Sequence, residues 1–159
     1  MENILDLSVI LPIKSMLMRD FEEFFQKAID SVLNQDFLPK NLIIVHGKDE
    51  NLSNFLKNYD FKNLTKTIVE FEGETSFANQ VNFGIAKAET KWVSILEVDD
   101  EYSKIWFKNV KTYVEAYPDV EGFLPIVIDV DERGQFVGFT NEATFAANFS
   151  NQNFLLVRN

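Results

Sequence analysis

The feature of this sequence that most constrains its fold is an alternation, repeated four times, of a short apolar run with a longer amphipathic segment. The runs are rich in Leu, Ile and Val, which is typical of strands buried on both faces of a parallel sheet. In the segments between them, apolar residues recur every three or four positions, as in helices that pack one face on a core. The alternation therefore predicts an α/β fold, a mostly parallel Rossmann-like sheet with helices on both faces.

The boundaries of these elements follow from the ends of the apolar runs and from residues that start or stop helices. The expected strands cover residues 7–13, 41–46, 67–71 and 92–96, and the expected helices cover residues 20–34, 50–59, 76–89 and 104–116. Two later runs, 122–130 and 135–140, flank a turn at Asp131–Gly134 and predict a C-terminal antiparallel hairpin. The run 92–96 is apolar enough to be a central strand. A length of 159 residues predicts a single domain over 1–159.

Composition and charge exclude several classes of function. The absence of cysteine removes disulfides, cysteine-ligated metals and thiol nucleophiles, and a single histidine, His46, excludes a multi-histidine metal site. With 25 acidic against 15 basic residues, the net charge of −10 argues against nucleic-acid binding. No apolar run is long enough to span a bilayer, and Glu2 and Asp6 stand where a signal peptide would be basic. We expect a cytoplasmic protein that is not transmembrane.

Open parallel sheets bind ligands beyond the carboxyl ends of their strands, which directs attention to four loops. These loops are Pro12–Ser15, His46–Asp49, Glu72–Ser76 and Glu97–Asp100. The first strand is followed neither by GxGxxG nor by GxxxxGK, which argues against dinucleotide-dependent oxidoreductases and P-loop enzymes.

The acidic residues after the fourth strand, Glu97, Asp99 and Asp100, are the strongest candidates for chemistry. Crowded carboxylates repel one another unless a cation joins them, and Mg²⁺ and Mn²⁺ prefer oxygen ligands. One interpretation is a clip for a divalent cation and a diphosphate ligand. The other is that these acids cap the helix that starts near Lys104, where negative charge is favourable in any case.

Several phrases of the sequence together resemble the nucleotide-binding half of family 2 glycosyltransferases, which are inverting enzymes of the GT-A fold. The matching phrases are LSVILPIKS at 7–15, SVLNQ at 31–35, the helix phrase A-x-N-x-G-I from Ala78 or Gln80 through Asn82 to Ala88, and LEVDD at 96–100 in place of the DxD phrase. The resemblance covers residues 7–108, which would bind the nucleotide sugar, and leaves 120–159 as a shortened acceptor-side portion.

The resemblance implies a nucleotide-diphosphate sugar as donor, with Mn²⁺ or Mg²⁺ held by Asp99 or Asp100. It does not identify the acceptor. Glu97 would lie toward the ribose, and Glu142 would be the base that deprotonates the acceptor. The residues expected to contact the nucleotide are Pro12, Ile13, Lys14, Ser15, His46, Asn82 and Glu97.

The sequence also departs from the family's motifs at two positions near the expected nucleotide site. His46–Asp49 replaces the family's Asp-Asp-Gly-Ser, so we expect base selection to differ from that of uridine-dependent relatives, and Val81 replaces an arginine. Two alternatives stay open: a degenerate GT-A module that binds a nucleotide sugar or a partner without transfer, and another nucleotide-dependent transferase. A homodimer or a second chain is a possible way of completing the site.

Overall fold

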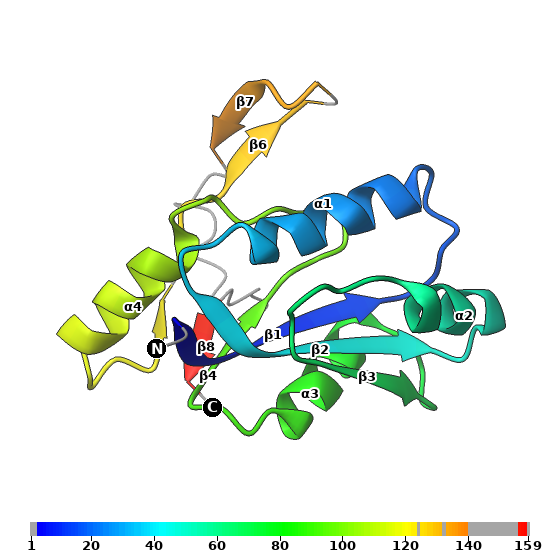
Figure 1. Ribbon diagram of the computed structural model, residues 1–159, viewed down its shortest axis with the longest axis horizontal. Helices are drawn as coiled ribbons and strands as arrows, with labels where there is room; N and C mark the ends of the chain where they lie inside the picture. The colour runs from blue at the N-terminus through cyan, green and yellow to red at the C-terminus, as the bar shows by residue number, and fades with distance from the viewer. Residues whose placement is uncertain (1–2, 124, 132, 140–155, 159) are drawn as a thin grey trace.

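A computed structural model describes residues 3–123, 125–131, 133–139 and 156–158 of the chain. Strands and helices alternate through its first three quarters, as expected (Figure 1). The elements are β1 (Ile4–Ile13), α1 (Phe21–Leu33), β2 (Leu38–Gly47), α2 (Glu50–Asn58), β3 (Lys66–Phe71), α3 (Phe77–Lys87), β4 (Trp92–Ile95), α4 (Trp106–Ala116), β5 (Gly122–Phe123), β6 (Ile128–Val130), β7 (Phe136–Phe139) and β8 (Leu156–Arg158). Within the described residues, none of the helices is both long and apolar enough to cross a membrane.

The main sheet has the strand order β3-β2-β1-β4-β8-β5. Its first four strands are parallel, and β8 runs antiparallel to both β4 and β5. All four residues of β4 are buried, and β4 lies between β1 and β8. The predicted α/β class, the mostly parallel sheet and the central position of this strand are confirmed.

The central strand β1 packs against helices on both of its faces, because successive side chains of a strand point to opposite sides. Leu7, Val9 and Leu11 belong to the larger core, which also contains buried residues of α1, α2 and α4. Ile10, between them in sequence, belongs to a second core, against which Phe83 and Ile85 of α3 pack. Figure 1 shows α1 and α2 on one side of the sheet and α3 on the other.

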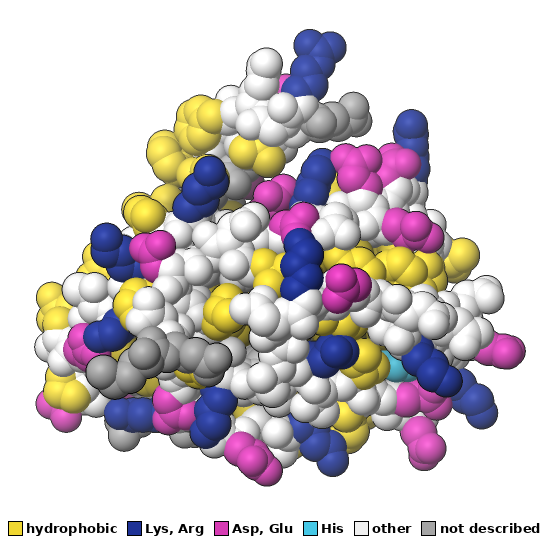
Figure 2. Space-filling view, viewed as in Figure 1, with side chains coloured by type: hydrophobic (Ala, Val, Ile, Leu, Met, Phe, Trp, Pro, Cys, Tyr) yellow, Lys and Arg dark blue, Asp and Glu magenta, His cyan; other side chains and the backbone are white. Residues whose placement is uncertain are grey.

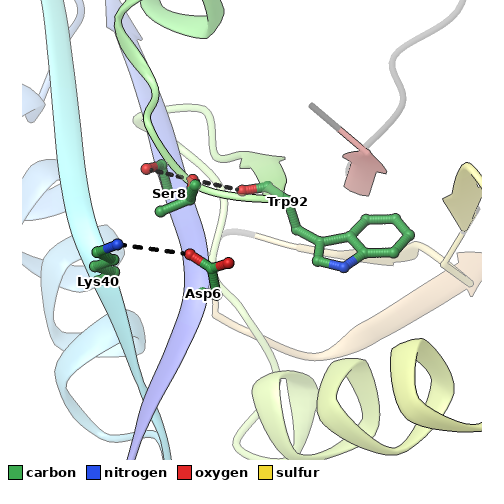
Figure 3. A network of polar contacts seen from close by, with 5 residues as sticks. Asp6, Ser8, Lys40 and Trp92 are labelled. Carbon is green, nitrogen blue, oxygen red and sulfur yellow. Dashed lines mark hydrogen bonds and ion pairs between the residues drawn. The ribbon is translucent and has the colours of Figure 1, made fainter. Parts of the chain in front are cut away.

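Polar contacts tie the amino-terminal half of β1 to its neighbours (Figure 3). Thr90 Oγ1 lies 2.8 Å from Ser8 Oγ and 2.9 Å from the main-chain oxygen of Trp92. Ser8 and Thr90 are both buried, so these contacts satisfy hydroxyl groups that would otherwise be costly to remove from water. At the surface, Lys40 Nζ lies 3.7 Å from Asp6 Oδ1, an exposed ion pair of little energetic weight.

The C-terminal hairpin is confirmed, but the prediction of one continuous strand over 122–130 is wrong. Residues 122–123 form β5 in the main sheet, whereas β6 pairs with β7 in a separate two-stranded sheet. Pro125 lies between the two strands and has no N–H to donate to a ladder, which explains the break. In the turn, Asp131 Oδ1 accepts hydrogen bonds from the N–H groups of Arg133 and Gln135, and Gly134 has a φ of +72° that favours glycine.

The β6–β7 hairpin carries an exposed apolar face. A register shift after Asp129 brings the rings of Phe136 and Phe139 to the same face, where their centroids lie 5.0 Å apart. Both rings, like the side chains of Ile128 and Val130, are more than half exposed. The hairpin projects from the body of the molecule in Figure 1, and hydrophobic side chains gather on it in Figure 2.

The packing of α3 on the sheet predicts a strong sensitivity at Gly84. A Cβ atom there would lie 2.6 Å from Ile10 Cγ2 and 3.1 Å from Val45 Cγ2, both in the core. We expect Gly84→Ala to lower the free energy of unfolding by about 1–3 kcal/mol because the helix must move off the sheet. Gly138→Ala is the matched control, since nothing lies within 4 Å of the Cβ position at Gly138. Urea denaturation of both variants checks this, and equal stabilities would contradict the close packing of α3.

Candidate functional site

A cleft of about 330 Å³ opens at the carboxyl ends of β1 and β4. Its walls come from the loop after β1, the first turns of α3 and the turn after β4. The lining residues are Pro12, Ile13, Lys14, Ser15, Met18, Phe77, Gln80, Glu97, Val98 and Asp99. The cleft therefore lies where ligands of open parallel sheets bind.

The residues that line the cleft come from both sides of the end of β1. Strand β1 lies between β2 and β4 in the sheet. On the β2 side, Gln80 of α3 contacts main-chain oxygens of both β1 and β2. On the β4 side, Glu97 and Asp99 lie in the turn that follows the strand after Leu96. The β4 side of the cleft is thus acidic.

The acidic side is a tight turn, in which the N–H of Asp100 donates to the carbonyl oxygen of Glu97 at 3.2 Å. Burial, and then repulsion from Asp100 and Asp99, raises the pKa of Glu97 above its usual range. Partial burial and repulsion from Asp99 likewise raise the pKa of Asp100. The turn therefore concentrates negative charge that a cation would relieve.

These carboxylates fit a divalent cation that a ligand helps to hold. Among the described residues there is no group of three or more acidic, histidine or cysteine side chains placed to enclose a metal. Mg²⁺ is ordinarily held by one or two carboxylates, with water and phosphate oxygens completing its shell. Asp99 lines the cleft and Asp100 is its neighbour outside that lining, so the turn offers that kind of incomplete donor set.

The alternative role of these acids as helix caps is wrong. Helix α4 begins at Trp106, and its N-cap residue, Ile105, provides no side-chain hydrogen bond. The N–H of Phe107 instead donates to Oε1 of Gln35 at 3.0 Å. Gln35 is the second residue after the end of α1. A glutamine from another part of the chain therefore satisfies a main-chain N–H at the start of α4.

The SVLNQ phrase fixes the segment that follows the acidic turn. Gln35 is buried, and its Nε2 donates to the carbonyl oxygens of Ser31 and Ser103, each at 2.8 Å. Ser31 Oγ accepts from the N–H of Tyr102 at 3.1 Å. The hydroxyl of Tyr102 contacts β4, since it lies 2.6 Å from Ser94 Oγ. The turn is therefore held by β4 on one side and by α1 on the other.

The structure brings together six of the expected site residues. Pro12, Ile13, Lys14, Ser15, Glu97 and Asp99 all line the cleft. His46 does not: it is 3% exposed, and its Nδ1 lies 2.7 Å from the carbonyl oxygen of Gly47, to which it must donate. Asn82 is exposed on α3 outside the cleft lining. Glu142 lies outside the described residues.

Four lining residues had not been identified from the sequence: Met18, Phe77, Gln80 and Val98. Of these four residues, only Gln80 could have been singled out from the sequence, because it is a long polar side chain at a position of α3 that faces the sheet. It is 1% exposed, although an amphipathic helix places few polar residues on its buried face.

The sequence model of a family described as Glycosyl transferase family 2 matches residues 8–152, which is most of the chain. The chain belongs to glycosyl transferase family 2. A comparison of this family 2 domain with curated proteins finds no match.

Crystal structures show the same fold at low sequence identity. S. aureus TarS 1-349 in complex with UDP-GlcNAc is 21% identical with a TM-score of 0.53, over 72% of this chain and 32% of that chain. S. aureus TarS 1-349 aligns with 14% identity and a TM-score of 0.60, over 97% of this chain and 47% of that chain. A CMP:2-keto-3-deoxy-manno-octonic acid synthetase complexed with CTP is 10% identical with a TM-score of 0.57, over 96% and 73%. The family 2 domain thus spans less than half of these TarS chains.

The contacts of Gln35 predict that it stabilises the region around the acidic turn. Gln35→Ala leaves a buried N–H and two carbonyl oxygens without their partner, and we expect a loss of about 1–3 kcal/mol in the free energy of unfolding. Gln26→Ala, on the exposed face of α1, is the control and should be nearly neutral. Chemical denaturation measures both, and equal stabilities would show that the Gln35 contacts contribute nothing.

Proposed function

We propose that this family 2 domain transfers a sugar from a nucleotide-diphosphate sugar with the help of Mn²⁺ or Mg²⁺. The observation that carries the proposal is the meeting of Glu97 and Asp99 with Lys14 and Ser15 in one cleft, at the carboxyl ends of adjacent parallel strands. Membership of the family supports sugar transfer. The TarS structure with UDP-GlcNAc supports a nucleotide sugar as the donor class.

Each part of the cleft has a chemical role in this proposal. Asp99 and Asp100 would hold the divalent cation, which when bound neutralises negative charge on the departing diphosphate. Lys14 is exposed at the lip of the cleft and would attract the same phosphates. Glu97, half-buried with a raised pKa, would accept a hydrogen bond from a ribose hydroxyl.

The acceptor hydroxyl needs a base, and we propose Glu142 for that role on the resemblance to the family alone. A second chain, or a second copy of this one, would complete the acceptor side if Glu142 does not. Binding of a nucleotide sugar without transfer is the second outcome that the experiment below distinguishes.

The proposal predicts metal-dependent binding of a nucleotide sugar that Asp99 controls. We expect at least one among UDP-, GDP-, CDP- and dTDP-sugars to raise the melting temperature in the presence of Mn²⁺. At about a hundred times its Kd, the shift should be about 5 °C. With a chelator in place of Mn²⁺, the same sugar should produce no shift. Asp99→Asn removes a charged oxygen ligand and should abolish this shift. In chelator the variant should be at least as stable as wild type, because it removes repulsion within the turn.

Asp119→Asn, at an exposed position after α4, is the matched control and should keep the full Mn²⁺ response. Identical Mn²⁺ responses of wild type and Asp99→Asn would exclude a divalent-cation site at Asp99. Release of the free nucleoside diphosphate, followed over time, separates transfer or hydrolysis from binding alone. The absence of any shift with every donor would overturn the proposed function itself.

A further inference from the structure

Strand β3 forms one edge of the main sheet, and among the described strands it pairs with β2 alone (Figure 1). On that side, the N–H of Leu42 donates to the carbonyl oxygen of Thr65 at 2.9 Å. The strand is six residues long, whereas β5, at the opposite edge of the sheet, has two residues. An edge of this length is a template on which a further strand can pair.

The main-chain groups that face this free edge belong to every second residue of β3. In a parallel ladder, a residue that bonds to the neighbouring strand is followed by one whose N–H and carbonyl groups point away from it. The carbonyl oxygen of Thr65 points to β2, so the outward residues are Lys66, Ile68 and Glu70. Each of them presents one donor and one acceptor to the free edge.

The side chains of these outward residues lie on one face of the sheet, because side chains alternate between faces along a strand. Lys66 Nζ lies 4.8 Å from the centre of the Phe61 ring, and Ile68 packs against the core to which that ring belongs. Lys66 and Glu70 are exposed, and Ile68 is partly buried. Along the edge, this face therefore carries a cation, an apolar side chain and an anion, in that order.

This order is complementary to itself when a second copy of the strand runs antiparallel. Pairing centred on Ile68 places Lys66 opposite Glu70 of the partner subunit, and Glu70 opposite the partner's Lys66. The two Ile68 side chains then meet across the two-fold axis and bury part of their remaining surface. A register centred on Lys66 or on Glu70 would instead place like charges opposite each other, which is unfavourable.

The same register also satisfies the main chain. In an antiparallel ladder, the pairs of residues that exchange both N–H···O bonds recur at every second position. The pairs formed by Lys66, Ile68 and Glu70 are all of this kind, because these are the residues whose groups face outward. On the other face of the sheet, Thr67 would lie opposite Val69 of the partner subunit, and both side chains are partly buried in the single copy.

We propose that the protein forms a two-fold homodimer through β3, in which two copies of this strand pair antiparallel about Ile68 and join their main sheets. Such an interface uses the same patch of surface on both copies, as two-fold dimers do. The two Lys66–Glu70 pairs supply local attraction against the general repulsion that a net charge of −10 causes. None of the residues that line the cleft belongs to β3, so this inference does not depend on the proposed function.

The test reverses the two charges separately and together. Sedimentation equilibrium of the wild type, from about 1 to about 200 µM, should show dimers whose share rises with concentration. Lys66→Glu and Glu70→Lys should each weaken dimerisation at least tenfold, because like charges then face each other at both ends of the ladder. An equimolar mixture of the two variants should associate within threefold of wild type, since every facing pair is again of opposite sign. The double variant Lys66→Glu/Glu70→Lys should do the same.

Lys108→Glu makes the same change of charge at an exposed position of α4 and should dimerise like wild type. Hydrogen exchange of the wild type adds a measurement that needs no variant to fold. The N–H groups of Ile68 and Glu70 should exchange at least tenfold more slowly at the upper concentration, where the dimer forms, than at the lower. The N–H of Thr67 faces β2 in either state, and its exchange should change less than threefold.

A wild type that stays monomeric throughout would overturn the inference. Dimers of equal strength in wild type and Lys66→Glu would place the interface elsewhere, for example at the exposed face of the β6–β7 hairpin, and would overturn it too. Weakened single variants that are folded by circular dichroism, and that mixing does not restore, would refute the pairing about Ile68. Nucleotide binding enters none of these measurements, so the inference and the proposed function fail separately.

Discussion

The burial of β1 on both faces is the constraint on which the rest of the structure depends. Each of its residues from Leu7 to Ile13 is buried, so no side of this strand can face water. Helices must cover both faces, and parallel neighbours must satisfy the main-chain groups along both edges. The same arrangement brings the carboxyl ends of β1 and β4 together, and the cleft lies there.

Polar side chains of the helices complete what the strands leave open. Gln80 reaches from α3 to the ends of β1 and β2, and Gln35 reaches from the end of α1 to the start of α4. Both use an amide to bond main-chain groups of elements that lie far apart in the sequence. The acidic turn between these two supports can keep its carboxylates close together because its flanks are fixed by neutral hydrogen bonds. The negative charge of the acidic turn therefore lies beside the cleft, where a cation bound with a ligand can compensate it.

The fold could be predicted from the sequence because its signals are local. Apolar runs and helical spacing lie within single elements, and they located all four parallel strands and their helices. Pro125 was the local signal that the prediction of a continuous strand over 122–130 had overlooked. The acidic turn and the loop after β1 could also be predicted as cleft residues, since the ends of parallel strands meet at one edge.

The roles of the two glutamines could not be predicted, because their partners lie far along the chain. Gln80 is 67 residues from Ile13, and Gln35 is 72 residues from Phe107, so neither contact leaves a periodic signal. The burial of His46 is likewise a tertiary property: a lone histidine after an apolar run has the same sequence pattern whether its ring is in a cleft or turned inward.

The projecting β6–β7 hairpin has a consequence for the behaviour of the protein in concentrated solution. Its two strands pair only with each other among the described strands, and its apolar face is exposed, a kind of surface that favours contacts between molecules. The net charge of −10 opposes such contacts through mutual repulsion between copies. Added salt and protonation of the acidic groups both weaken that repulsion, so we expect association through the hairpin to increase with ionic strength and at acidic pH.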